Sequence, residues 1–193
     1  EHYRCRPAII EFCNRMYYDG QLIAMTDPSD ARETPMRVVH AAPGNHARRL
    51  RGGRYSQREI DIIAQLEDLR LLDRGVTTGD KDESGDYVLG IVTPYREQAN
   101  RAGARVRQES ESGGHARWLA ETAHKFQGRG AGTIVFSTVL DSDDTAGGDT
   151  GFYDDSRITN VAVSRAKDRV VVVTAHGGVR HSRNVTALLD YIT

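Results

Sequence analysis

Apolar residues gather in short runs that are separated by longer polar or amphipathic stretches. The runs predict strands at residues 36–40, 87–93, 133–140 and 168–175, with a further short strand from Trp118 to Thr122. Runs with few polar interruptions are typical of strands that are buried on both faces of a parallel sheet.

The stretches between these runs carry helix signals. Pro7 suits a first helical turn, apolar residues recur at helical spacing as far as Met16, and Gly20 indicates the helix end. Ser56 and Glu59 form the S-x-x-E pattern of a capping box. The helix that follows it is expected to bury Ile62, Ile63, Leu66 and Leu69.

Two more helices are expected, one that begins at Thr93 and Pro94 and one over residues 183–192. Residues 21–35 and 42–54 are expected to be loops. Because helices alternate with buried strands, the pattern predicts an α/β fold with a mostly parallel sheet and helices on both faces. Sheets of this kind bind ligands at the carboxyl ends of their strands.

The charge balance excludes a bulk polycation, since 26 Lys and Arg residues stand against 27 Asp and Glu residues, for a net charge of −1. Any nucleic-acid contact must therefore come from a local patch. Arg48, Arg49, Arg51 and Arg54 form one candidate patch. They either contact phosphates or belong to a solvated connection, and Tyr55 is the one neighbouring aromatic residue that could stack on a base.

Other kinds of site find little support. Cys5 and Cys13 are expected to be reduced thiols, and the seven His residues are too scattered to predict a metal site. Ser164 and His176 could join a hydrolase triad, but the sequence has no G-x-S-x-G motif. We see no signal peptide and no apolar run of about 18 residues, so we expect a cytoplasmic protein without a membrane partner.

Four polar clusters beside the expected strands and helices carry the candidate chemistry. They are HYRCRP at 2–7, TPYREQ at 93–98, ETAHKFQGRG at 121–130 and RITNVAVSRAK at 157–167. Each cluster alone is compatible with an ordinary helix start or a solvated surface. Their order and spacing together are far more specific.

In this order the clusters resemble the motifs of superfamily 1 helicases, in the branch related to the nonsense-mediated-decay and Dna2-type enzymes. The segment HYRCRPAIIEFCNRMYYDGQL resembles the fourth motif, GIVTPYREQ the next conserved element, ETAHKFQGRGAGTIVFS the fifth motif and ITNVAVSRAKDRVVVVT the sixth. The resemblance spans nearly the whole chain. It implies the C-terminal, second RecA-like domain of a two-domain ATP-dependent motor, with the P-loop NTPase fold.

The resemblance also implies roles around a nucleotide, because ATP and Mg²⁺ bind between the two domains of such a motor. Tyr3 would stack on or near the adenine, and Arg4 would reach the γ-phosphate. Arg165 would be the arginine finger, since a planar guanidinium can stabilise the charge on a transferring phosphoryl group. Gln127 and Gly128 would lie near the γ-phosphate, where a glycine permits close approach of the backbone.

By the same resemblance, Thr93, Thr122 and His124 would contact a single-stranded nucleic acid. Contacts with the phosphate backbone do not distinguish DNA from RNA. We expect them to be independent of base sequence and sensitive to salt.

The chain departs from the family pattern in two respects. Gly130 stands where the family carries an acid that hydrogen-bonds the ribose, and residues 1–193 contain no G-x-x-x-x-G-K-[ST] phosphate loop. We therefore expect residues 1–193 to be a single RecA-like domain and a fragment of a longer chain. The fragment lacks the first domain of the motor. We expect that it does not hydrolyse ATP alone and that it holds neither ATP nor Mg²⁺ tightly. The alternative is a degenerate RecA-like module that binds nucleic acid or a partner protein.

Overall fold

The computed structural model describes residues 4–26, 35–44, 46–50, 53–66, 87–113, 119–141, 154–175 and 182–193. Its centre is a five-stranded sheet with the order β1-β7-β6-β4-β5, in which every neighbouring pair is parallel. The strands are β1 (Met36–Ala41), β4 (Tyr87–Thr93), β5 (Leu119–Thr122), β6 (Ala131–Ser137) and β7 (Ala166–Ala175). Their carboxyl ends therefore form one edge, the carboxyl edge, and their amino ends form the amino edge.

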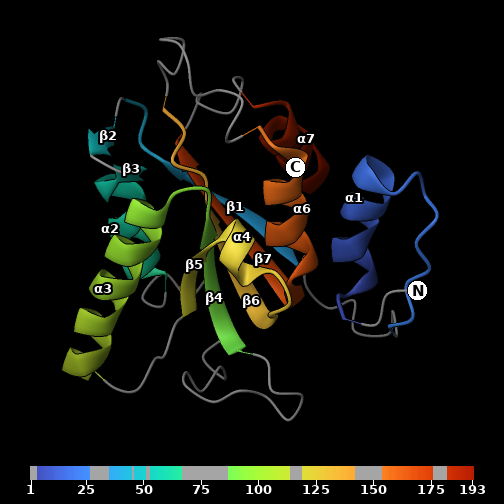
Figure 1. The fold of residues 1–193 in the computed structure, drawn as a ribbon, viewed down its shortest axis with the longest axis horizontal. Coiled ribbons are helices and arrows are strands. Elements are labelled where there is room, and N and C mark those ends of the chain that lie inside the picture. The colour runs from blue at the N-terminus through green and yellow to red at the C-terminus, as the bar shows by residue number, and fades with distance from the viewer. Residues whose placement is uncertain are drawn as a thin grey trace.

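Helices cover both faces of this sheet (Figure 1). α2 and α3 pack on one face, whereas α4, α6 and α7 pack on the other, with α1 against α6. The helices are α1 (Pro7–Tyr17), α2 (Gln57–Gln65), α3 (Arg96–Gly113), α4 (Ala123–Phe126), α6 (Ser156–Ser164) and α7 (Arg183–Ile192). The predicted α/β fold is confirmed.

The two-sided core explains why the strands are apolar without alternation. Along β6, Ile134 and Phe136 belong to the core under α1, α4, α6 and α7, whereas Val135 belongs to the core under α2 and α3. All three side chains are buried. Because successive strand residues point to opposite faces and both faces are covered, each position favours an apolar residue.

Gly90 on β4 allows α4 to lie directly on the sheet. A Cβ at this position would stand 2.6 Å from Phe126 Cζ and 2.9 Å from Ile134 Cδ1, so a larger residue would force α4 away. The chain after β5 thus crosses the face of the sheet close to β4 before it begins β6. As a result, the residues before and after α4 lie at opposite edges of the sheet.

The predicted loop at 42–54 is wrong in its second half, which forms an antiparallel hairpin beside α3. The strands of the hairpin are β2 (Ala47–Leu50) and β3 (Gly53–Ser56). Arg54 is buried beside the Tyr95 ring and does not belong to an exposed basic patch. Short strands rich in arginine and glycine carry no period-2 signal, so their packing against α3 specifies them.

Two predicted boundaries shift at the carboxyl edge. α3 begins at Arg96 and not at Thr93, because the Thr93 hydroxyl accepts a hydrogen bond from Tyr95 N at 3.5 Å and the chain turns there. β6 ends at Ser137, earlier than predicted, and Val139 beyond it adopts a left-handed φ of 56°.

The first helix is confirmed, with one correction. Gly20, with a φ of 73°, ends the helical region and donates its N–H to Asn14 O at 3.0 Å. Met16, expected on the buried face, is 39% exposed. Among the residues that the structure describes, no helix has both the length and the apolar character needed to span a bilayer. Tyr3, Arg51, Leu69, Trp118 and His176 lie outside the described residues.

Candidate functional site

Arg165 lies at the amino edge, between α6 and β7. Its backbone caps α6, and its carbonyl accepts a hydrogen bond at 3.0 Å from Ala131 N at the start of β6. The side chain is half-buried, and its Nε is buried without a hydrogen-bond partner among the described residues. An unpaired buried donor is unfavourable, and an anion at this edge would satisfy it.

Arg4 joins the same edge through the segment that leads into α1. Arg4 Nη1 donates to Arg129 O at 3.2 Å, just before β6. Arg6 N donates to Lys167 O at 2.9 Å, near the start of β7 and two residues after Arg165. These bonds hold the segment that carries Arg4 beside the strand ends where Arg165 also lies.

Cys5 is buried at the same edge, beside the end of α6. Its Sγ donates to Ser164 O at 3.3 Å. Burial raises the pKa of Cys5 to about 12, while the charges of Arg165 and Arg4 act to lower it. A thiol with a raised pKa is a poor nucleophile at neutral pH. Cys5 and Cys13 are both free and buried.

The turn after α4 borders the arginines. Arg129 N donates to Phe126 O at 3.1 Å, and the Phe126 ring anchors the turn in the core. Gln127 and Gly128 are exposed. Gly128 has a φ of 80°, and no heavy atom lies within 4 Å of the position that a Cβ would take. The turn thus offers an open backbone that a ligand can approach closely.

This group of residues fits a polyphosphate. Guanidinium groups bind phosphate oxygens through charge-assisted hydrogen bonds, and Arg4 and Arg165 stand together at one edge. The Gln127 amide and the bare Gly128 backbone lie on the adjoining turn. Tyr3, the predicted adenine contact, lies outside the described residues.

The predicted nucleic-acid residues meet at the opposite, carboxyl edge. Thr93 and Thr122 end neighbouring strands and are paired in register. Thr122 is half-buried, and His124 follows it in α4 with an exposed side chain. Thr93 is fully buried, so its hydroxyl shapes the turn before α3. Thr122 and His124 therefore present the accessible groups of this cluster.

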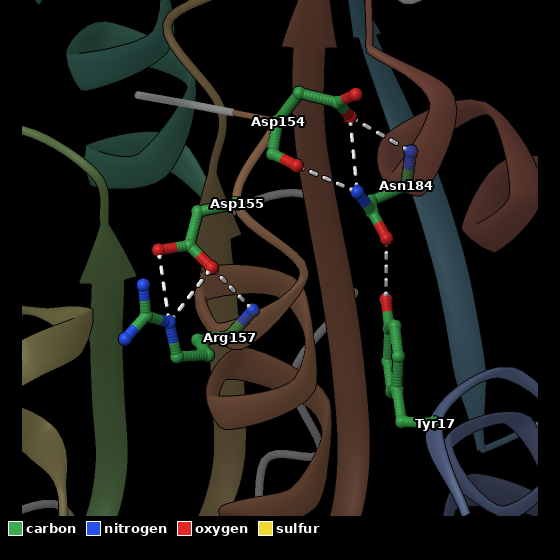
Figure 2. A network of polar contacts seen from close by, with 5 residues as sticks. All are labelled: Tyr17, Asp154, Asp155, Arg157 and Asn184. Atoms are coloured by element: carbon green, nitrogen blue, oxygen red, sulfur yellow. Dashed lines mark hydrogen bonds and ion pairs between the residues drawn. The ribbon is translucent and has the colours of Figure 1, made fainter. Parts of the chain in front are cut away.

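Sequence reasoning missed Asp155 and Arg157, which lie beside His124. Asp155 caps α6 and accepts hydrogen bonds from Arg157 N at 2.9 Å and Arg157 Nε at 3.1 Å (Figure 2). Partial burial by itself would raise the pKa of Asp155, but these bonds and the charges of Arg157 and His124 lower it. The Arg157 side chain is 77% exposed and adds a cation to the carboxyl edge. An Asp before a predicted helix was the available signal.

A buried acid, Glu59, supports this edge from behind, a role that the capping-box pattern did not indicate. Its oxygens accept hydrogen bonds from Ser137 Oγ at 2.6 Å and Val139 N at 3.0 Å. Gln98 Nε2 donates to the same Ser137 hydroxyl at 2.8 Å, which ties α3 to the network. Burial raises the pKa of Glu59 to about 8, although the hydrogen bonds oppose this shift.

Comparisons with known proteins show the family to which the chain is similar. A family model described as "AAA domain" matches residues 1–177. The chain is 28% identical over 193 residues to "Putative helicase mov-10-B.1" of Danio rerio, which covers 90% of this chain and 19% of that protein. It is 26% identical over 193 residues to "Probable helicase with zinc finger domain" of Homo sapiens, with 90% of this chain and 10% of that protein covered.

A third relative, "DNA-binding protein SMUBP-2" of Rattus norvegicus, is 24% identical over 210 residues and covers 99% of this chain and 19% of that protein. The chain thus spans about a fifth or less of the length of these relatives. Among solved structures, the C-terminal domain of a possible DNA helicase from Lactobacillus plantarun WCFS1 matches with a TM-score of 0.52 and 10% identity, over 97% of this chain and 94% of that one. At this identity the likeness shows the fold alone, which is the predicted RecA-like fold.

Proposed function

Because the chain belongs to the AAA domain family, as a C-terminal RecA-like domain of a superfamily 1 helicase, we propose that it is the second motor domain of an ATP-dependent helicase. In this role it supplies the arginine finger and part of the nucleic-acid track. The observation that carries the proposal is the division of the candidate residues between two edges of one sheet. Arg4, Gln127, Gly128 and Arg165 lie toward the amino edge, and Thr122 and His124 lie at the carboxyl edge.

At the amino edge, Arg4 and Arg165 would hold the terminal phosphates of ATP. The nucleotide with its Mg²⁺ supplies the phosphoryl group that is transferred to water. Arg165 would donate from its guanidinium to the negative charge that develops on this group. Gln127 would donate from its amide beside the same phosphate, and Gly128 would leave room for it.

The proposal assigns the remaining half of the pocket to a first RecA-like domain. The sequence contains no phosphate loop, so another domain must cradle the β-phosphate and bind Mg²⁺. Gly130 is buried at the position of the family's ribose-binding acid. The alternative interpretation, a degenerate RecA-like module, is supported by Gly130 alone. The position of Arg4 and Arg165 at the same edge favours a motor domain. We expect the chain by itself to lack ATP hydrolysis.

At the carboxyl edge, Thr122 and His124 would contact the backbone of a single strand of DNA or RNA. Arg157 would add a positive charge beside them. Such contacts depend on phosphates and sugars and not on base identity. The buried Glu59 network would keep the chain that leaves β6 in place behind them.

The test is the binding of a labelled single-stranded oligonucleotide to the purified chain, followed by fluorescence anisotropy over a salt series. We expect salt-sensitive binding that the double variant T122A/H124A weakens by about tenfold, which corresponds to two hydrogen bonds of about 0.7 kcal/mol each. The control R107A, far along α3, should leave the affinity near that of the wild type. Absence of binding at low salt, or equal affinity of T122A/H124A and the wild type, would overturn the nucleic-acid role.

A further inference from the structure

We propose that the β2–β3 hairpin is a second contact for single-stranded nucleic acid, adjacent to Thr93 and Thr122. The hairpin comprises Ala47–Leu50 and Gly53–Ser56. This inference rests on the proposed function, because it extends the nucleic-acid track of the carboxyl edge. The proposed ligand of the hairpin is the phosphate backbone of the nucleic acid.

The hairpin stands next to the point where β4 ends. A Cβ added at Gly53 would lie 3.5 Å from Glu97 Cβ and 4.0 Å from Tyr95 Cβ. Tyr95 comes two residues after Thr93, the last residue of β4. A strand of nucleic acid that reaches Thr122 beside Thr93 therefore has the hairpin as its neighbour on the α3 side (Figure 1).

Several contacts anchor the hairpin to the rest of the domain. The Asp141 carboxylate, in the segment after β6, accepts hydrogen bonds from His46 N at 2.7 Å and Ala47 N at 2.9 Å. At the other end, Ser56 N donates to Gln98 Oε1 at 2.8 Å. Both ends of the hairpin are thus tied to elements of the carboxyl edge, so its side chains are presented from a fixed position.

Aromatic contacts hold the second strand of the hairpin on α3. The Arg101 guanidinium lies over the Tyr55 ring at 3.9 Å from its centroid. The Arg54 guanidinium lies 6.0 Å from the centroid of the Tyr95 ring. These contacts occupy β3, which leaves β2 as the exposed strand, with Arg48, Arg49 and Leu50 all exposed.

The hairpin carries an excess of positive charge. Arg49 is directly opposite Arg54 in the antiparallel pair, and like charges in this arrangement destabilise a hairpin. The exposed side chain of Arg49 forms no hydrogen bond or ion pair with the other residues that the structure describes. From Met36 to Arg58 the sequence contains no Asp or Glu, although the whole chain has a net charge of −1. Under the proposed function, the phosphate groups of a bound single strand would be the anions that meet this charge.

The experiment compares three double variants of the chain with the wild type by anisotropy titration with labelled oligothymidylate and oligouridylate over a salt series. R48A/R49A should bind more weakly and lower the slope of log K against log salt by about 1.4, about 0.7 for each lost phosphate contact. R48K/R49K should keep the slope, because the charges remain. R15A/R107A, which removes two arginines on α1 and far along α3, should also keep it. Circular dichroism checks that each variant is folded.

The outcomes separate this inference from the function on which it rests. If the wild type binds and T122A/H124A weakens binding, but R48A/R49A keeps the wild-type slope, the hairpin contact is wrong and the proposed function stands. If R48A/R49A weakens binding to polyglutamate and not to oligonucleotides, the hairpin is a protein-binding surface and the inference is also wrong. If the wild type binds neither oligonucleotide, both proposals fall.

Discussion

At the scale of single residues, the Glu59 carboxylate holds the backbone where the chain leaves β6. Val139 has a φ of 56°, which is strained for a β-branched residue. Its N–H donates to both carboxylate oxygens, at 3.0 and 3.1 Å. Because Ser137 donates to the same carboxylate, Glu59 satisfies this turn and offsets its strain. Asp141, which anchors the hairpin, follows directly after this turn.

We expect Glu59 to make the free energy of unfolding fall as pH rises. Burial raises the pKa of Glu59 from 4.5 to about 8, so the folded chain binds the proton more tightly than the unfolded chain. The resulting stabilisation is complete below pH 4.5 and is lost as the pH rises through about 8. E59Q, which cannot ionise, should show a flatter profile in urea unfolding between about pH 5 and pH 8.

The matched control for this prediction is E97Q. Glu97 pairs with Arg101 at 2.6 Å on the surface of α3 and is not fully buried. Its neutralisation should therefore leave the wild-type slope in place. Identical pH profiles for the wild type and E59Q would contradict the role of Glu59.

At the scale of elements, Asp154 joins three helices at the carboxyl edge (Figure 2). Its Oδ1 accepts a hydrogen bond from Asn184 N at 3.0 Å, at the start of α7. It also accepts one from Ser182 Oγ at 2.9 Å. Asn184 Oδ1 accepts a hydrogen bond from Tyr17 OH at 3.2 Å, at the end of α1. Because Asp154 directly precedes the cap of α6, this junction fixes the helix that carries Arg165 at its far end.

We expect D154A to lower the free energy of unfolding by about 1–3 kcal/mol, because it leaves the donors at the start of α7 without their acceptor. R157A, a control variant at a residue also shown in Figure 2, removes an exposed cation. It should lower the free energy of unfolding by less than about 1 kcal/mol. Urea unfolding of both variants measures the difference. Equal losses for D154A and R157A would show that the junction does not stabilise the helices.

At the scale of the whole molecule, α4 and α6 connect the two candidate contact regions. α4 follows Thr122 at the carboxyl edge and leads to Gln127 and Gly128. α6 begins beside His124 and ends at Arg165. Because Phe126 packs on Gly90 without room for a Cβ, a displacement of α4 would move both of its ends. Under the proposed function, α4 and α6 would couple the nucleotide state to the contact with a single strand.

Substitutions should nevertheless affect the proposed functions of the two edges separately. In a protein that joins this chain to a phosphate-loop domain, we expect R165A to lower ATP turnover by about 10³-fold, as for loss of an arginine finger. The affinity for single strands without nucleotide should stay near the wild-type value. R6A, at the same edge with its side chain near Asp168, should lower turnover by less than about tenfold. Equal effects of R165A and R6A on turnover would exclude the finger role.

Much of the fold could be predicted from the sequence, because its signals are local. The apolar run at 87–93 and the helix at 183–192 coincide with β4 and α7, since burial on both faces or on one helical stripe leaves a periodic trace. The hairpin could not be predicted, because β2 and β3 have no apolar alternation and form against α3. One half of the predicted capping box forms, because Ser56 Oγ accepts a hydrogen bond from Glu59 N at 3.3 Å. The Glu59 side chain instead accepts a hydrogen bond from Ser137 at the end of β6.

The sequence by itself therefore determined the α/β class, the buried strands and the motifs that mark the helicase family. Only the tertiary structure decided which motif residues meet. It placed Arg4 beside Arg129 at the amino edge, where Arg165 also lies, placed Thr122 at the opposite edge, and buried Thr93 and Arg54. The physical reason is that burial and helical periodicity act between near neighbours along the chain. Contacts among distant polar groups depend on strand order and register, which no local pattern specifies.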